Sequence, residues 1–516
     1  MNRAGFQRLI LGLQMAAGLW GAGGSAANAA PPSLDAILPS GGKAGSETLL
    51  TLVGKAEPWP CGVWCSNPGV TFAPDGEKKG QFLAKIAPDA RPGPCLVRLH
   101  NPDGASEPRF LTIGTLKEVA EDEKADNDNP AGGQKLEGLP VTLNGRLEKS
   151  QDVDCYTVML NAEQSFFVHC DSYALRAGTD PFLHLYGPDG SRLLLENDNP
   201  RNLDPRLRFK ATQSGFHTLA IMAIASPPNA NVSFHGAANA VYRLTLATNE
   251  SALPARYSPE VPAEDTPEAP DSKPPLDVMG TLSKPGETDR HRFSATKGQT
   301  LRLRAEATTH GFPTDPVMNL RKSEDDSVIR SVDDGTRDQP AAEYVWKVPA
   351  DGLYVVEIGD RFHRGGSDFR YRLTIAEPEP DFSATADKNA YVIEPGKAAE
   401  IKLKVTRENG HDAPLELKID GLPEGVTAEP PEIPAKTADV TVKLSGTADT
   451  RAASVPIRVR VVEKTGGEKP RNRVAAFSFQ DSNARGPYLI DEIADLWLTV
   501  KAKPPDEKSK DEAKKK

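Results

Sequence analysis

The sequence predicts an all-β protein made of tandem β-sandwiches. Short runs that alternate apolar and polar residues, such as LLTLVG, CLVRLH, LRLRAEA and VTVKL, are separated by Gly, Pro, Asn and Asp. Runs of this kind at intervals of about 8–12 residues are typical of antiparallel sandwiches. The 516 residues also have room for several domains. In addition, one stretch of sequence recurs 135 residues later, as Asp154 and Asp289 illustrate. We therefore expect four sandwiches, the central two being copies of one domain.

Residues 1–29 have the pattern of a secretory signal peptide. Arg3 and Arg8 precede an apolar run, and Ala27-Asn28-Ala29 supplies small residues before a cleavage site. No later segment reaches the ~20 consecutive apolar residues that a membrane span needs. We expect an exported chain, periplasmic, on the cell surface or extracellular, with no membrane insertion after cleavage. An uncleaved N-terminal anchor is the alternative.

The charge of the chain argues against nucleic acid as a partner. The formal net charge is −10, and removing two arginines and no acids with the signal peptide makes it −12. An acidic surface does not attract phosphate backbones or anionic lipids. The charged tail, residues 504–516, is expected to be a solvated terminus.

Two segments of linker composition separate the segments with strand patterns. Residues 117–137 are acidic and nearly free of aromatics, and residues 250–275 are rich in Pro. Both are expected to be extended and exposed. The expected sandwich domains are residues 31–116, 138–249, 276–376 and 381–503.

Motifs in the two central domains occur in the same order. TDPF at 179 matches TDPV at 314, GFHTL at 215 matches GLYVV at 352, and YRLT at 242 recurs at 371. The order DVDCYTVML, TDPFLHLYGPDG, SGFHTLAI and AVYRLTL resembles the bacterial pre-peptidase C-terminal domain, a jelly-roll-like β-sandwich found in secreted proteases and other exported proteins. The resemblance covers residues 138–249 and, in a more divergent form, residues 276–376.

The flanking domains resemble immunoglobulin-like modules. Residues 31–116 are similar to the immunoglobulin-like domain of the transcription-factor type found in many surface proteins. Residues 381–503, with IEPGKAAEIKLKV and ASVPIRVRVV, look like a bacterial immunoglobulin-like or NPCBM-associated extracellular module. The whole arrangement resembles large exported proteins of planctomycete-type bacteria, which is a likeness of architecture and carries no activity.

The usual catalytic motifs are missing from the mature sequence. It has no GxSxG, HExxH, P-loop or paired CxxC, and its histidines are scattered singly. The sequence therefore favours a non-catalytic binding or spacer protein of the cell envelope, with an extracellular protein or polysaccharide as partner. Two alternatives stay open: an accessory subunit of a separately encoded secreted peptidase or other hydrolase, and a hydrolase with an unrecognised site.

Calcium is the expected cofactor, if there is one. Hard cations take oxygen ligands from Asp, Asn and backbone carbonyls, and in some pre-peptidase-like domains the acidic lead-in contributes to such a site. The alternative is that these acids are turn formers that bond their own backbone. The candidate ligands in the lead-in and in the loops of the first copy are Asp126, Asp128, Asp180, Asp198 and Asp204.

The five cysteines can form disulfides in an exported chain. Cys155 and Cys170 lie symmetrically about the turn NAEQ, so in a hairpin they would be opposite each other. We expect a bridge between them. Cys95 is expected to pair with either Cys61 or Cys65, which leaves one thiol.

Trp59 and Trp64 flank Cys61 in the segment WPCGVWC. Exposed aromatic rings with polar neighbours are the usual platform for a carbohydrate, so these two are candidates for one. The alternative is that they cover the small core of the first domain and a disulfide loop.

Overall fold

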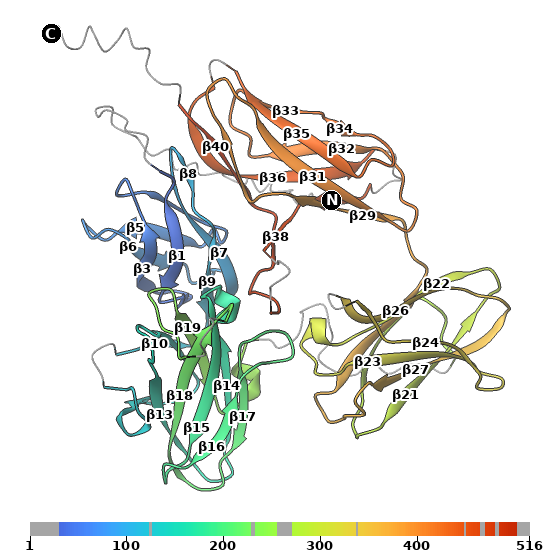
Figure 1. Cartoon of the computed structure of the whole chain (residues 1–516), viewed down its shortest axis with the longest axis horizontal. Coiled ribbons are helices and arrows are strands. Elements are labelled where there is room, and N and C mark those ends of the chain that lie inside the picture. The colour runs from blue at the N-terminus through green and yellow to red at the C-terminus, as the bar shows by residue number, and fades with distance from the viewer. Residues whose placement is uncertain are drawn as a thin grey trace, which may run out of the picture.

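The computed structural model describes residues 30–122, 126–228, 233–254, 271–336, 339–447, 450–464, 470–479 and 485–502. These residues form β-strands and four short 3-10 turns with no α-helix, so the expected all-β class is confirmed (Figure 1). In this part of the chain no helix could cross a membrane. The signal peptide at 1–29 and the whole charged tail at 504–516 lie outside the described residues, as do residues 255–270 of the Pro-rich segment. The turns are Pro130–Gly132, Tyr173–Leu175, Glu250–Ala252 and Thr308–His310.

The first module packs a sheet of order β1-β3-β6-β5 against a second of order β2-β9-β7-β4, with β8 paired to β7. In β6 the sequence QFLAKI alternates: Phe82, Ala84 and Ile86 point inward and the residues between them point outward. This is the pattern of a sheet with one face exposed to solvent. The strands are β1 (Ser33–Leu38), β2 (Gly41–Lys43), β3 (Glu47–Lys55), β4 (Gly62–Cys65), β5 (Val70–Pro74), β6 (Gln81–Ile86), β7 (Gly93–Asn101), β8 (Gly104–Ala105) and β9 (Arg109–Gly114).

The first central module, or first copy, has sheets of order β10-β12-β19-β14-β17 and β11-β13-β18-β15-β16. The expected free linker at 117–137 is in part wrong, because β10 and β11 of that segment pair in parallel with β12 and β13. The strands are β10 (Lys117–Ala120), β11 (Gln134–Lys135), β12 (Val141–Arg146), β13 (Asp154–Leu160), β14 (Ser165–Asp171), β15 (Thr179–Tyr186), β16 (Arg192–Glu196), β17 (Arg206–Lys210), β18 (Gly215–Ala225) and β19 (Val241–Ala247).

The second copy repeats this strand order. Its sheets run β20-β28-β22-β26-β25 and β21-β27-β23-β24, which correspond in sequence to β12-β19-β14-β17 and β13-β18-β15-β16. The strands are β20 (Leu276–Thr281), β21 (Thr288–Ala295), β22 (Thr300–Glu306), β23 (Pro316–Lys322), β24 (Val328–Val332), β25 (Asp334–Thr336), β26 (Gln339–Lys347), β27 (Gly352–Asp360) and β28 (Arg370–Ala376).

The C-terminal module pairs a sheet β29-β31-β35-β33 with a sheet β30-β40-β36-β32-β34, and β37 joins the edge of β36. A short ladder of β38 and β39 extends from it. The strands are β29 (Asp381–Ala386), β30 (Ala390–Ile393), β31 (Ala399–Glu408), β32 (Leu415–Asp420), β33 (Val426–Glu429), β34 (Glu432–Ile433), β35 (Asp439–Gly446), β36 (Ala453–Glu463), β37 (Asn472–Val474), β38 (Phe477–Ser478), β39 (Glu492–Ile493) and β40 (Leu496–Val500).

The C-terminal module returns to the start of the chain, and its β38 region reaches toward the first copy (Figure 1). One apolar cluster joins Phe110 of the first module, Leu175 of the first copy and Ile493 of the C-terminal module. Fully buried Arg98 donates to the Asn389 side chain at 3.0 Å and to its carbonyl at 3.3 Å. Three of the four modules are therefore packed together through a shared core.

Candidate functional site

The outer face of the β13-β18-β15-β16 sheet carries a group of partly exposed rings. In β15 the sequence TDPFLHLY alternates, so Leu183 and Leu185 enter the core while Phe182, His184 and Tyr186 lie on the outside and are partly exposed. We call this group and the apolar side chains beside it the aromatic face. Its members are Phe182, His184, Tyr186, Leu195, Met222, which is only 4% exposed, and Phe234 of a neighbouring loop.

The rings of the aromatic face contact one another. The ring centroids of Phe182 and His184 lie 5.8 Å apart, those of Phe182 and Phe234 5.7 Å, and those of His184 and Tyr186 6.1 Å. Leu195 is 50% exposed and Phe234 37%. Burial and the charge of Arg192 lower the pKa of His184, so its imidazole is neutral at neutral pH. The face therefore presents rings and aliphatic side chains to the solvent without a net charge on the histidine.

Strand register makes the two copies comparable side chain by side chain. In the first copy His184 pairs with Ala220 on one side and Leu195 on the other, and Ala220 pairs with Cys155. In the second copy the same row is Arg290, Glu357, Asn319 and Ser331. A row of cysteine, alanine, histidine and leucine in one copy, with only Leu195 well exposed, is therefore a charged and polar row in the other.

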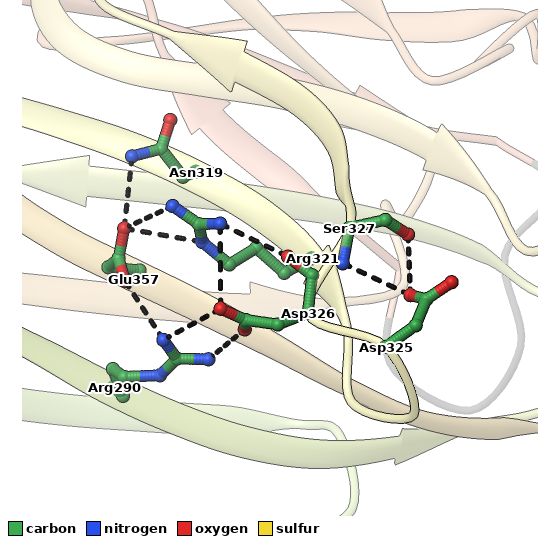
Figure 2. A network of polar contacts seen from close by, with 7 residues as sticks. All are labelled: Arg290, Asn319, Arg321, Asp325, Asp326, Ser327 and Glu357. Atoms are coloured by element: carbon green, nitrogen blue, oxygen red, sulfur yellow. Dashed lines mark hydrogen bonds and ion pairs between the residues drawn. The ribbon is translucent and has the colours of Figure 1, made fainter.

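Figure 2 shows that the polar side chains of this second-copy row form hydrogen bonds and ion pairs with one another and with their neighbours. Glu357 accepts hydrogen bonds from Arg321 at 2.8 Å, from Arg290 at 3.2 Å and from Asn319 at 3.3 Å. Arg290 also pairs with Asp326, whose carbonyl accepts from Arg321 at 3.1 Å. The charged groups of this face are taken up by one another, which leaves little for a ligand to gain.

A second candidate lies where the acidic lead-in meets β13. The Asn127 amide donates to the Asp154 carboxylate at 3.3 Å and to the Glu121 carboxylate at 3.4 Å. The Tyr242 hydroxyl donates to Asp154 at 2.7 Å, and the Arg146 backbone N–H donates to Glu121 at 2.9 Å. We call Glu121, Asn127 and Asp154 the acidic junction.

The two carboxylates of the acidic junction compete for one proton. Burial, followed by the nearby charge of Glu121, raises the pKa of Asp154 from 3.8 to about 9. Burial also raises the pKa of Glu121. Two close carboxylates are oxygen donors that a hard cation takes, so Glu121 and Asp154 are the residues that would hold calcium here, whereas Asn127 points its N–H group at both of them.

The five acids expected as ligands do not converge on one ion. Asp126 and Asp128 are exposed beside the junction, where Asp128 forms an ion pair with Lys149 at 3.2 Å. Asp204 instead caps the Tyr173–Leu175 turn, accepting the N–H groups of residues 172, 173 and 174 at 2.8 Å each. Its role is structural.

Asp180 and Asp198 form a further pair. Burial, and then the charge of Asp198, raise the pKa of Asp180 to about 6. The matching residues of the second copy belong to the group Asp315, Asp333 and Asp334, whose ligand atoms lie within 4.8 Å of one another and could hold a metal ion. Arg361 forms an ion pair with Asp333.

Sequence reasoning missed Glu121 and Asp154. Both were visible: Glu121 belongs to the acidic lead-in, and Asp154 recurs as Asp289 in the second copy. Asp289 accepts a hydrogen bond from the Tyr371 hydroxyl at 2.7 Å, as Asp154 does from Tyr242. The retention of an acid at this position in both copies was the available signal.

The expected hairpin with a Cys155–Cys170 bridge is wrong. Cys155 lies on β13, which pairs with β18, whereas Cys170 lies on β14, which pairs with β17 and β19 of the opposite sheet. The connection between β13 and β14 crosses from one layer to the other. Both thiols are free and buried, Cys155 near the outer face and Cys170 in the core.

Trp59 and Trp64 do not form a common platform. Trp59 packs edge-on against Phe82 at 5.0 Å and donates its indole N–H to the Gly76 carbonyl at 3.3 Å. Trp64 packs edge-on against Trp497 of the C-terminal module at 5.8 Å. The first covers the core of its module, and the second is an interface residue.

No protein-family model matches the chain, and no curated protein matches it. Among solved structures, it matches the pre-peptidase C-terminal domain of collagenase from Bacillus anthracis, with 16% identity, 23% of this chain and 99% of that chain covered, and a TM-score of 0.18. A protein from Eubacterium rectale described as secreted matches with 8% identity over 50% of this chain and 86% of that one, TM-score 0.16. A protein of the Bacteroides ovatus mixed-linkage glucan utilization locus, in complex with a mixed-linkage heptasaccharide, matches with 10% identity over 65% and 72%, TM-score 0.14.

Proposed function

We propose that the chain is an exported, non-catalytic modular protein that binds an extracellular protein or polysaccharide through the aromatic face. In this proposal the other modules act as the spacer that holds the face in position at the cell envelope. The observation that carries the proposal is the contrast between the copies: at the same register one scaffold bears partly exposed aromatic rings and exposed Leu195 in the first copy, and side chains that pair with one another in the second.

Physical chemistry supports binding at the apolar copy. Exposed apolar side chains gathered on one face mark interaction sites more often than singly scattered ones do. Aromatic rings bury a large area with few rotatable bonds, so they dominate the energetics of interfaces. The Tyr186 hydroxyl and the neutral His184 imidazole, 3.3 Å apart, add hydrogen-bonding groups to the face. Rings and aliphatic groups, in place of paired carboxylates, support binding rather than hydrolysis.

The spacer role is supported by the packing of the modules. The stacked rings of Tyr173 and Tyr488, with centroids 5.2 Å apart, join the first copy to the C-terminal module. The Arg176 guanidinium lies 4.3 Å from the ring centroid of Phe479 in the same junction. Contacts of this kind limit hinge motion between modules, so the orientation of the face is set by the body that carries it.

The test exchanges the face for its counterpart in the second copy. The double variant Phe182→Val, Leu195→Ser places on the first copy the residues that the second copy has at the same register. Binding of residues 30–516 is measured against a panel of purified polysaccharides and extracellular proteins. We expect a loss of affinity on the order of 10-fold or more for the bound panel member.

The matched control is Val328→Ser, which removes a 51% exposed apolar side chain from the edge strand of the second copy. It should bind as the wild type does. Equal affinity of the double variant and the wild type would refute the assignment of the face. Turnover of any panel member by the wild type would refute the non-catalytic role, and binding that needs a secreted peptidase would favour the accessory-subunit alternative.

A further inference from the structure

The sulfur atoms of two cysteines in the first module are in contact. Cys65 ends β4 and Cys95 lies in β7, and register places Cys65 opposite Val97, so Cys95 is its diagonal neighbour on the same face. The two Sγ atoms are 3.5 Å apart. Among the described residues this is the one thiol–thiol contact recorded. Cys61 is buried in the same core and has no such partner there.

We propose that Cys65 and Cys95 are joined by a disulfide in the exported protein, with Cys61 remaining a thiol. The sequence left Cys61 and Cys65 as equal partners for Cys95, and the side-chain geometry selects Cys65. Closing the bond needs the sulfur atoms to approach by roughly 1.5 Å, since an S–S bond is about 2.05 Å long. Rotation of the two side chains on a fixed strand pair supplies a movement of that size.

The two cysteines differ in reactivity, so one of them is expected to react with the oxidant first. The Asn67 backbone N–H donates to the Cys65 sulfur at 3.4 Å, and Cys65 is only partly buried, whereas Cys95 is 3% exposed. The hydrogen bond with the Cys95 thiol lowers the pKa of Cys65, and the same contact and burial raise that of Cys95. Cys65 is therefore the thiol that reacts first, because the thiolate is the nucleophile.

The oxidant is a thiol–disulfide oxidoreductase in its disulfide form. The Cys65 thiolate, having lost its proton to water, attacks one sulfur of that disulfide and releases the other as a thiolate. Cys95 then attacks the Cys65 sulfur of the mixed disulfide, its proton going to the leaving sulfur. The chain loses two hydrogen atoms and two electrons, and the oxidoreductase gains them as two thiols.

The disulfide would link β4 to β7, the strand pair that contacts the C-terminal module. Trp64, next to Cys65, is paired in register with Arg98. These are the side chains that contact Trp497 and Asn389 of that module. A disulfide closing the 30-residue interval between Cys65 and Cys95 restricts the unfolded chain and holds β4 against β7.

The test is a peptide map of the unreduced wild-type protein after export to an oxidising compartment and alkylation. We expect a peptide pair linked through Cys65 and Cys95, alkylated Cys61, and an intact mass lower by two hydrogens than after reduction. Alkylation of all three cysteines, or a link from Cys61 to Cys95, would overturn the proposal. Since the wild type decides the question, variants that fail to fold do not leave it open.

Variants then test the consequence for stability. Cys65→Ser and Cys95→Ser should each lower the melting temperature of the first module by on the order of 10 °C. Cys61→Ser is the matched control, because it removes a buried thiol and leaves the link in place. A drop in the control equal to that of the other two would show that thiol packing, and not the bond, stabilises the module.

Discussion

The substitution Asp154→Asn tests the acidic junction. In the wild type, burial and the charge of Glu121 raise the pKa of Asp154 from 3.8 to about 9. Between these two pH values the native state keeps the Asp154 proton, whereas the unfolded state releases it. The contribution of Asp154 to the free energy of unfolding is therefore complete below about pH 3.8 and is lost as the pH rises toward 9. Each pH unit in that window costs up to about 1.4 kcal/mol. Without divalent cations, the free energy of unfolding of the first copy should fall by about 2–3 kcal/mol from pH 5 to pH 7.

The variant removes this proton requirement. The new amide still accepts the hydrogen bond from Tyr242 and can donate to Glu121. Its nitrogen then faces the Asn127 amide, which is also a donor, so that hydrogen bond is lost at a cost of about 1 kcal/mol. At pH 7 in chelator, the variant should therefore be more stable than the wild type, by on the order of 2 kcal/mol, with a flatter pH profile. Calcium should reverse the order, because it needs both carboxylates; at 100 times its Kd it would stabilise the wild type by about 2.7 kcal/mol.

The assay is hydrogen exchange of residues 30–516, read by mass spectrometry on peptides from β13 and β19, which reports the opening of this module alone. The control Asp289→Asn removes the matching acid of the second copy and should leave the exchange of the first copy unchanged. A variant less stable than the wild type at every pH in chelator would refute the shared-proton argument. An absence of any calcium effect on the wild type would remove the metal site.

Three further substitutions probe the scaffold. Arg98→Ala removes the fully buried guanidinium that binds Asn389, and it should cost about 3–5 kcal/mol and increase proteolysis between the modules. Asp204→Ala leaves three backbone N–H groups without their acceptor, so a loss of about 2–4 kcal/mol is expected in exchange experiments on the first copy. Glu357→Ala removes the buried carboxylate that Arg321 and Arg290 share, so a loss of about 1–3 kcal/mol that changes little in high salt is expected. An effect that disappears in high salt would show that water screens this pair.

Local pattern predicted the strands and their faces because alternation is a property of neighbouring residues. The sequence TDPFLHLY of β15 shows which side chains enter the core before any partner strand is known. The duplication was equally visible, since motifs in the same order need no long-range information. The aromatic face itself was not predicted: Phe182 becomes notable only when strand register sets it beside Met222, and the face as a whole only by comparison with the ionic row of the second copy.

The local sequence pattern did not show to which of the two sheets a strand belongs. The turn NAEQ between β13 and β14 suits a hairpin and also an arch from one sheet to the other, and only the pairing of β14 with β19 decides between them. The contact of Arg98 with Asn389 spans 291 residues, and a buried arginine in β7 has no sequence signal that separates it from an exposed one. The loop acids could not be told apart for the same reason: Asp204 accepts three backbone N–H groups, whereas Asp180 lies near Asp198, and the sequence around them does not show this difference.

Comparison of the two copies distinguishes the residues that the fold needs from the residues that can vary. An acid that accepts from a buried tyrosine hydroxyl occurs in both copies, as buried Asp154 with Tyr242 and partly buried Asp289 with Tyr371, because a buried hydroxyl left without a partner would cost about 1–3 kcal/mol. The outer face carries no such constraint, so its residues were free to diverge. In the second copy they diverged toward side chains that satisfy one another. In the first they left Leu195 half exposed, and water does not favour that arrangement. In the proposed function a partner would bury the aromatic face and remove this cost. The second copy, which has the same fold, is the control for measuring that partner's affinity.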